Sequence, residues 1–254
     1  MKILISNDDG IDSPGIKALA EAVKDLGEVF VVAPHRERST AGHSLTLHKP
    51  LRIHDLGNNY FSTSGTPADC VYLGIREIVK GRPDLILSGI NRGANLGTDL
   101  YYSGTVAAAR EGALMNIRSY AFSLVDLSLT IPNSPREKLR FPMAAQWARK
   151  VIEETLNISF PAHSLLNVNI PNLESEKIKG LKVARQGFRY YKDEVTKRTD
   201  PRGREYYWIG GPYKGFEEDP LSDCHAIEES FVSIAPINID CTHNQFYTTL
   251  QESL

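Results

Sequence analysis

Short apolar runs alternate with amphipathic segments through the first two thirds of the chain. The runs are continuous, as expected of strands covered on both faces of a sheet. We predict strands at 3–5, 29–33, 84–88, 120–125 and 165–170, and helices near 14–26, 67–79, 106–115 and 144–156. Strands joined through helices pair in parallel, so the pattern predicts an α/β fold, a three-layer αβα sandwich with a mostly parallel sheet.

Local signals fix where most of these helices start. Ser13-Pro14 and Thr66-Pro67 each place a capping hydroxyl before a proline that loses no hydrogen bond at the first helical position. The start of the helix near 144–156 stays open, because Ser134-Pro135 and Phe141-Pro142 could each begin it.

The last third of the chain has a different composition. Between 177 and 220 Tyr, Lys, Arg and Glu replace the apolar runs, and the turn sequence Asp200-Pro201-Arg202-Gly203 separates 189–198 from 204–209. This pattern predicts a C-terminal β-hairpin arm. Its aromatic residues pack either on the parent domain or on another subunit; they are Tyr190, Tyr191, Tyr206, Tyr207 and Trp208. We divide the chain into a catalytic domain at 1–176 and an arm with its return segment, for oligomerisation, at 177–254.

Composition excludes several classes of protein. The 254 residues carry a formal net charge of −2 and a pI near 6.4, so a nucleic-acid polymer or a membrane surface is not the expected ligand. The three cysteines form no CxxC pair, which favours a reducing compartment. The N-terminus has too short an apolar run for a signal peptide, and no stretch is long enough for a membrane span. We therefore expect a cytoplasmic protein.

Polar side chains gather where three predicted strands end. Asn7, Asp8 and Asp9 follow the first strand, a loop with Ser39 follows the second, and Asn91 and Asn95 follow the third. Ligands bind beyond the carboxyl ends of parallel strands, and carboxylate, hydroxyl and amide oxygens suit Mg²⁺, Mn²⁺ or Ca²⁺. Each residue alone has an ordinary alternative as a turn or cap; their joint placement favours a metal site.

A second candidate site is Ser103-Gly104-Thr105 at the start of a helix, where free amides and the positive dipole end suit an anion. An ordinary serine N-cap is the alternative. The loop from His35 to Lys49 is cationic, and it either attracts a phosphate or is a solvated surface loop.

Taken together, these motifs resemble the SurE (survival protein E) nucleotidases. The segment Asn7-Asp8-Asp9-Gly10 through Ile16 is similar to the N-terminal signature of that family. Six blocks match in order and span nearly the whole chain, at 7–16, 33–39, 65–71, 88–95, 102–109 and 232–236. Ala235 departs from the family pattern, in which threonine is frequent, and this affects only C-terminal packing.

The resemblance implies a Rossmann-like domain, a swapped C-terminal arm and a metal-dependent phosphatase acting on nucleoside 5′- and 3′-monophosphates. It implies that Asp8, Asp9, Ser39 and Asn91 bind one divalent cation per subunit, Mg²⁺ or Mn²⁺. It further implies that Asn95, Ser103, Gly104 and Thr105 contact the phosphoryl group. We expect Asp8, Asp9 and Asn95 to be catalytic, with Asp9 the favoured general base, in a homodimer or homotetramer.

Two other classes stay open at this stage. A non-catalytic nucleotide-binding module would use the same crevice, although adjacent carboxylates would repel a phosphate unless a cation lies between them. A nucleotide-sugar transferase also uses a metal to bridge phosphates.

Overall fold

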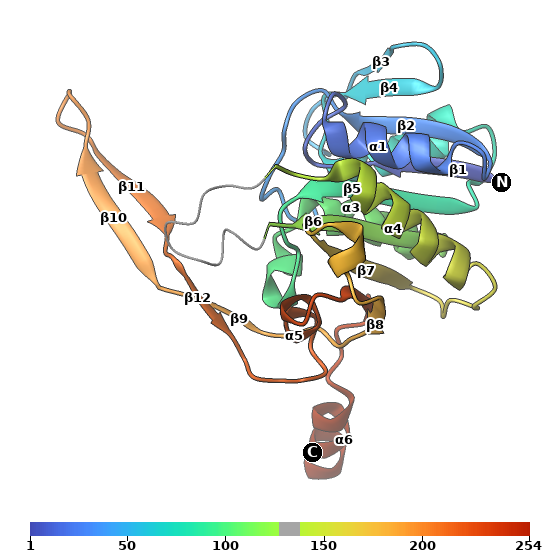
Figure 1. Cartoon of the computed structure of the whole chain (residues 1–254). Helices are drawn as coiled ribbons and strands as arrows, with labels where there is room; N and C mark the ends of the chain where they lie inside the picture. Colours follow the sequence, from blue (N-terminus) through green and yellow to red (C-terminus); the bar gives the residue numbers. More distant parts are fainter. Residues whose placement is uncertain (127–137) are drawn as a thin grey trace.

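The computed structural model describes residues 1–126 and 138–254, and its centre is a twisted, mostly parallel sheet (Figure 1). Within the described residues the sheet has nine strands. Their order is β3 (Ile53–Asp55), β4 (Tyr60–Thr63), β2 (Glu28–Pro34), β1 (Lys2–Ser6), β5 (Leu85–Arg92), β6 (Arg118–Val125), β7 (Ser164–Pro171), β13 (Val232–Asn238) and β8 (Leu181–Val183). The five strands predicted from apolar runs are β1, β2, β5, β6 and β7, and each pairs with its neighbours among them in parallel.

The sheet also contains strands that the pattern did not indicate. β3 and β4 form an antiparallel pair at one edge, and β4 joins β2 in parallel. At the other edge β13 runs antiparallel to β7 and parallel to β8. Residues beyond 176 therefore complete the main sheet as well as forming an arm. The functional division at 176/177 stays a prediction.

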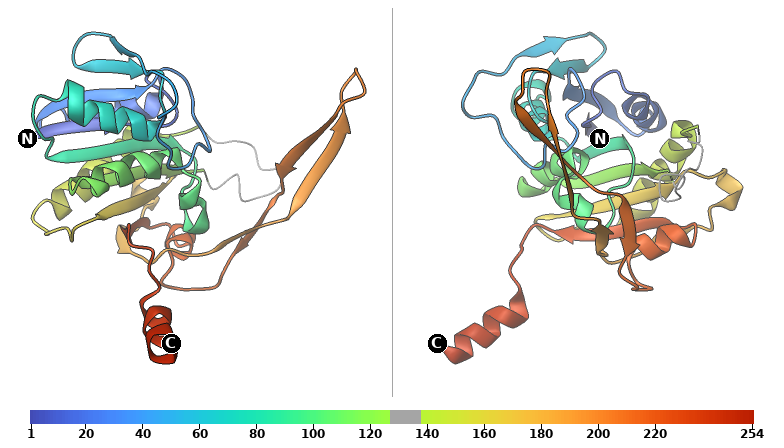
Figure 2. Two further views of the ribbon diagram at one scale, coloured as in Figure 1. Left: turned by 180° about the vertical axis from the view of Figure 1, so that it is seen from behind. Right: turned by 90° about the vertical axis from the view of Figure 1, so that its left-hand side faces the viewer.

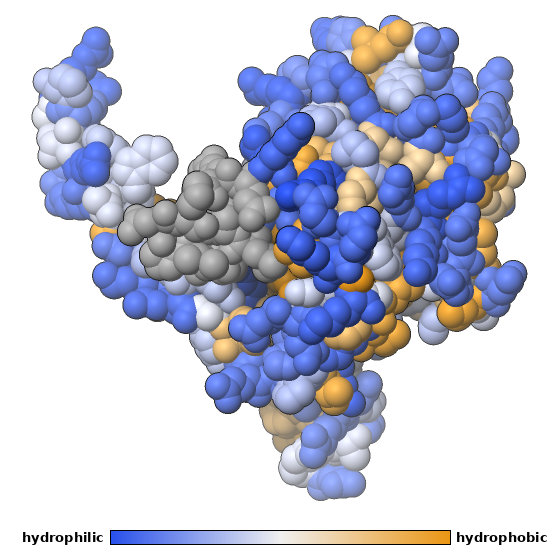
Figure 3. Space-filling model, in the orientation of Figure 1, coloured by the Kyte–Doolittle hydropathy of each residue, from blue (hydrophilic) through white to orange (hydrophobic). Residues whose placement is uncertain are grey.

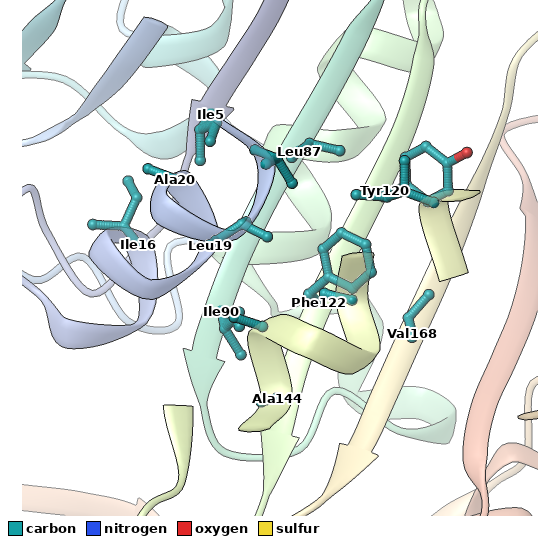
Figure 4. Packing of buried hydrophobic residues seen from close by; sticks show 14 of the residues in the cluster. Ile5, Ile16, Leu19, Ala20, Leu87, Ile90, Tyr120, Phe122, Ala144 and Val168 are labelled. Carbon is teal, nitrogen blue, oxygen red and sulfur yellow. The ribbon is translucent and has the colours of Figure 1, made fainter. Parts of the chain in front are cut away.

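Helices cover both faces of the sheet, as the αβα prediction requires. They are α1 (Pro14–Val23), α2 (Pro67–Leu73), α3 (Gly104–Leu114), α4 (Phe141–Thr155) and α5 (Asp223–Glu228). A further helix, α6 (Asn244–Ser253), lies away from the sheet (Figure 1). Strand alternation divides the core, because Ile3 and Ile5 pack on the side of α1 and α4 whereas Leu4 packs on the side of α2. Figure 4 shows Ile16 and Leu19 of α1 beside strand residues of that first core.

The predicted helix starts agree with the structure. Ser13 caps α1, and Thr66 forms a capping box with Asp69 at the start of α2. α4 begins at Phe141, so Phe141-Pro142 is its start; Ser134-Pro135 lies outside the described residues. The helix predicted at 67–79 is instead α2 followed by a π-helical turn, Gly74–Ile78.

Two parts of the C-terminal segment extend away from the body: a β-hairpin arm and helix α6. β9 (Arg189–Tyr191) pairs with β12 (Tyr213–Phe216), and beyond them β10 (Glu194–Thr199) pairs with β11 (Glu205–Gly210) around the predicted turn. This arm and α6 both project from the body (Figures 1 and 2). In the space-filling view the outer arm shows hydrophilic and intermediate colours (Figure 3). The predicted hairpin arm is therefore present.

Candidate functional site

A pocket of about 1020 Å³ opens at the carboxyl edge of the central strands, beside the base of the arm. It brings together residues from the loops after β1 and β2, the end of β5, the start of α3 and the arm. The sequence-predicted residues that line it are Asp8, Asp9, Ser39, Asn91, Asn95 and Ser103. Residues that are distant in sequence therefore meet at the edge where an α/β sheet binds its ligands.

Asp8 is the most buried carboxylate in this pocket, with 6% of its surface exposed. The Thr105 hydroxyl donates a hydrogen bond to its Oδ1, and the Arg38 amide donates to its main-chain carbonyl at 2.8 Å. Burial raises the pKa of Asp8 to about 6, although the Thr105 hydrogen bond acts in the opposite direction. A carboxylate whose charged form is disfavoured in this way is stabilised by a cation beside it.

Asp9 and Asn91 approach the pocket from neighbouring strands. The Arg92 amide donates to Asp9 Oδ2 at 3.1 Å and so ties the loop after β1 to the end of β5. Burial raises the pKa of Asp9 as well. The Asn91 Nδ2 donates to the Gly93 carbonyl at 3.0 Å, which leaves Asn91 Oδ1 as the atom available for a ligand.

Ser39 reaches the pocket from the loop after β2. Its hydroxyl donates to Glu37 Oε1 at 2.5 Å, so its oxygen lone pairs stay available. Gly10 has φ +97°, and a Cβ there would lie 3.2 Å from the main-chain carbon of Arg36. Only glycine therefore lets the Asp8-Asp9 turn pack closely against the loop that carries Ser39.

The start of α3 supports Asp8 from the other side. Ser103 caps the helix by accepting from the Val106 amide at 3.0 Å, and it lines the pocket. Thr105 is completely buried with its hydroxyl on Asp8. A Cβ on Gly104 would lie only 2.7 Å from Asp8 Cβ. The segment predicted as an anion site therefore also sets the position of Asp8.

Asn95 is held by a polar network that sequence inspection missed. Asn169 of β7 accepts from the Asn95 amide at 2.9 Å and donates to its carbonyl at 3.0 Å, and Asn167 donates to the same carbonyl at 2.8 Å. The Asn95 Nδ2 donates to Ser123 Oγ at 2.7 Å. One of its two amide protons is then left for a ligand. β7 was recognised only as an apolar strand, and the two asparagines alternating within it were the available signal.

Glu37 is a further carboxylate of the pocket that the sequence did not single out as a site residue. Besides Ser39 it contacts Arg92, with the ion pair at 3.8 Å. The cationic loop has mostly structural partners: Arg38 donates to the Ser64 carbonyl, and His43 Nε2 lies 2.9 Å from Glu111 Oε2 on α3. For the rest of the loop, phosphate attraction stays the alternative to a solvated surface loop, which the sequence favours.

The chemistry of the donor set fits a hard divalent cation. In the described part of the chain, no group of three or more His, Cys, Asp or Glu side chains could hold a metal ion. A site here therefore draws on neutral oxygens as well. Asp8 and Asp9 supply the charge, and Ser39 and Asn91 Oδ1 supply neutral oxygens, a combination suited to Mg²⁺ or Mn²⁺ and unlike the N/S sets of zinc.

The pKa of Asp8 predicts how the metal-free protein responds to pH. The folded-state pKa lies above the usual 3.8, so the folded protein binds more protons than the unfolded one between pH 4 and 6, and its stability falls as pH rises through that window. About two pKa units correspond to about 3 kcal/mol. We expect Asp8→Asn, which removes the charge, to raise the melting temperature in excess EDTA at pH 7.5 by about 6 to 10 °C.

The difference between the variant and the unmodified protein is the quantity to measure, by circular dichroism melts from pH 3 to 8. It should shrink as the pH falls from 6 to 4 and vanish near pH 3, where Asp8 is protonated in both the folded and the unfolded state. A variant that is less stable than the unmodified protein at pH 7.5 in EDTA would contradict the proposed burial cost.

Together, the fold and this pocket define a Rossmann-like α/β protein with an acidic, oxygen-rich ligand site at the carboxyl edge of its sheet. The family model described as "Survival protein SurE" matches residues 3–193. The chain belongs to the SurE family.

Relatives match over nearly their whole lengths. A "5'-nucleotidase SurE" of Geotalea daltonii is 46% identical over 252 residues, covering 99% of this chain and 98% of that protein. One of Pelobacter propionicus is 48% identical over 243 residues, covering 96% and 95%. The crystal structure of the SurE protein from Aquifex aeolicus superposes with a TM-score of 0.85 at 43% identity, covering 99% of both chains.

Proposed function

We propose that this protein is a metal-dependent 5′-nucleotidase, a phosphatase that hydrolyses nucleoside 5′- and 3′-monophosphates to nucleoside and phosphate. The observation that carries the proposal is the pairing of two adjacent carboxylates, the buried Asp8 and the half-buried Asp9, with the start of α3 in one pocket. Near-full-length relatives named 5'-nucleotidase SurE support it.

In this proposal Asp8, Asp9, Ser39 and Asn91 bind one divalent cation. When bound, such a cation polarises the phosphoryl group and lowers the pKa of a coordinated water. Asn95 donates its free amide proton to a phosphoryl oxygen, held in place by Asn169 and Ser123. Ser103 and Gly104, at the positive end of α3, bind the remaining phosphoryl oxygens. Thr105 orients Asp8.

Asp9 is the general base that we favour. Its carboxylate is fixed by the hydrogen bond that Oδ2 accepts from the Arg92 amide. This would hold Asp9 beside the water that the cation would bind, in position to take its proton.

The test is phosphate release from AMP, GMP, CMP, UMP and 3′-AMP, without any sugar acceptor, in Mg²⁺, Mn²⁺ or excess EDTA. We expect turnover with a divalent ion and none in EDTA. Undiminished activity in EDTA would refute the metal dependence. Nucleotide binding without phosphate release from any substrate would favour the non-catalytic module.

Assembly and location belong to the same proposal. We infer a homodimer or homotetramer, supported by the projecting arm and by α6, whose Phe246, Tyr247 and Leu250 are exposed. The three free cysteines support a cytoplasmic location. No helix in the described ranges has the length and apolar character needed to cross a bilayer.

A further inference from the structure

The pocket is much larger than a phosphoryl group, and much of its lining is aromatic. Besides the carboxylates and the start of α3, five aromatic residues line it. They are Tyr101 and Tyr102, directly before the N-cap Ser103, and Phe188, Tyr190 and Tyr191 at the base of the arm. All five rings are substantially exposed. Exposed aromatic surface that is gathered in one pocket is typical of a site that an apolar or aromatic ligand covers.

Alternation along the arm assigns its side chains to two roles. Arg189 and Tyr191 point to Asp99 of the body: the Arg189 guanidinium forms an ion pair with it, and the Tyr191 hydroxyl donates to Asp99 Oδ2 at 2.7 Å. Phe188 and Tyr190, on the opposite face, contact each other with ring centroids 5.2 Å apart. The first pair therefore anchors the arm, and the second pair is left as an open aromatic surface.

The two aromatic segments are tied to each other. Asp99 lies in the 3₁₀ helix Gly97–Tyr101, so its bonds to the arm connect that helix directly to β9. A second bridge is Asp223 of α5, whose two carboxylate oxygens accept from the Gly97 amide and the Gly187 amide, each at 2.9 Å. The aromatic lining is thus preformed, which lowers the ordering cost of binding.

We propose that Phe188 and Tyr190 form a stacking platform for the nucleobase, in the pocket that Tyr102 also lines. The inference rests on the proposed function and adds how the substrate is distinguished from other phosphate esters. Stacking uses the π-face that every base presents, so the platform accepts all bases and binds the larger purines more tightly. No base-specific hydrogen bond is required.

The test compares AMP with ribose 5-phosphate, which has the same phosphoryl group and sugar but lacks the base. We expect the unmodified enzyme to favour AMP in kcat/KM by about 10- to 100-fold, the size of stacking on one base. Phe188→Leu/Tyr190→Leu should reduce that ratio toward 1, chiefly by raising KM for AMP, with ribose 5-phosphate unchanged. Tyr190→Leu alone should give a smaller change of the same kind.

Tyr206→Leu/Tyr207→Leu is the matched control, because these tyrosines are exposed on the same arm but do not line the pocket. It should leave the ratio unchanged. The platform is refuted if the Phe188/Tyr190 variant slows both substrates equally, or if it changes only the oligomeric state by light scattering.

Calorimetric binding of adenosine separates this inference from the proposed function. Adenosine binding that is lost in the variant, in a protein that releases no phosphate, would refute the nucleotidase and keep the platform. Turnover of AMP and ribose 5-phosphate with equal efficiency would refute the platform and keep the phosphatase activity.

Discussion

Asp8→Asn is expected to lower phosphate release from AMP by about 10³-fold or more, because it removes one of two charges that hold the cation beside the reacting group. Calorimetric titration of Mn²⁺ into the variant should show a matching loss of affinity. The fold should be retained, because the amide oxygen of asparagine can still accept from the Thr105 hydroxyl.

The matched control is Asp12→Asn, the same chemical change in the same loop. Asp12 is highly exposed and forms an ion pair with Lys17, at 3.4 Å, on the surface. Its variant should keep full turnover and Mn²⁺ affinity. If Asp8→Asn retained tight Mn²⁺ binding, Asp8 would not be a ligand and the metal site would have to be placed elsewhere.

The elements that could be predicted are those whose signals are local. The strand at 29–33 is apolar throughout because both of its faces are covered, and the Ser13 and Thr66 caps use only their own helices. β3 could not be predicted, since its three residues are exposed and carry no alternation. β13 pairs antiparallel with β7. The hydrophobic pattern of one strand does not indicate which other strand it pairs with, so this pairing could not be predicted.

The same distinction between local signals and distant contacts applies to the residues of the candidate site. Asp8, Asp9, Asn91 and Ser103 could be proposed because each stands at the end of a strand or the start of a helix, and parallel strands bring such positions together. Asn169 holds the backbone of Asn95 from 74 residues away. Residues so far apart form no recognisable motif in the sequence. The hydrogen bonds that hold Asn95 could therefore be found only in the structure.

Gly104→Ala is expected to reduce turnover by about 10²-fold without replacing any side chain that binds the ion or the phosphate. The added methyl group would lie 2.7 Å from Asp8 Cβ and 2.9 Å from Asp8 Oδ2. The main chain of Asp8 is held by the Arg38 amide, so the carboxylate has to rotate or the start of α3 has to move away. Either shift separates the ligands that the cation requires together.

Alanine itself suits the first turn of a helix, so circular dichroism should show an unchanged helix content. Gly210→Ala is the matched control, because Gly210 also lines the pocket but nothing lies within 4 Å of a Cβ added there, so no metal ligand is displaced. It should keep both Mn²⁺ affinity and turnover. If Gly104→Ala also kept both, then Asp8 would have room to move without consequence, and the close packing of α3 against the first loop would not be what positions the metal ligands.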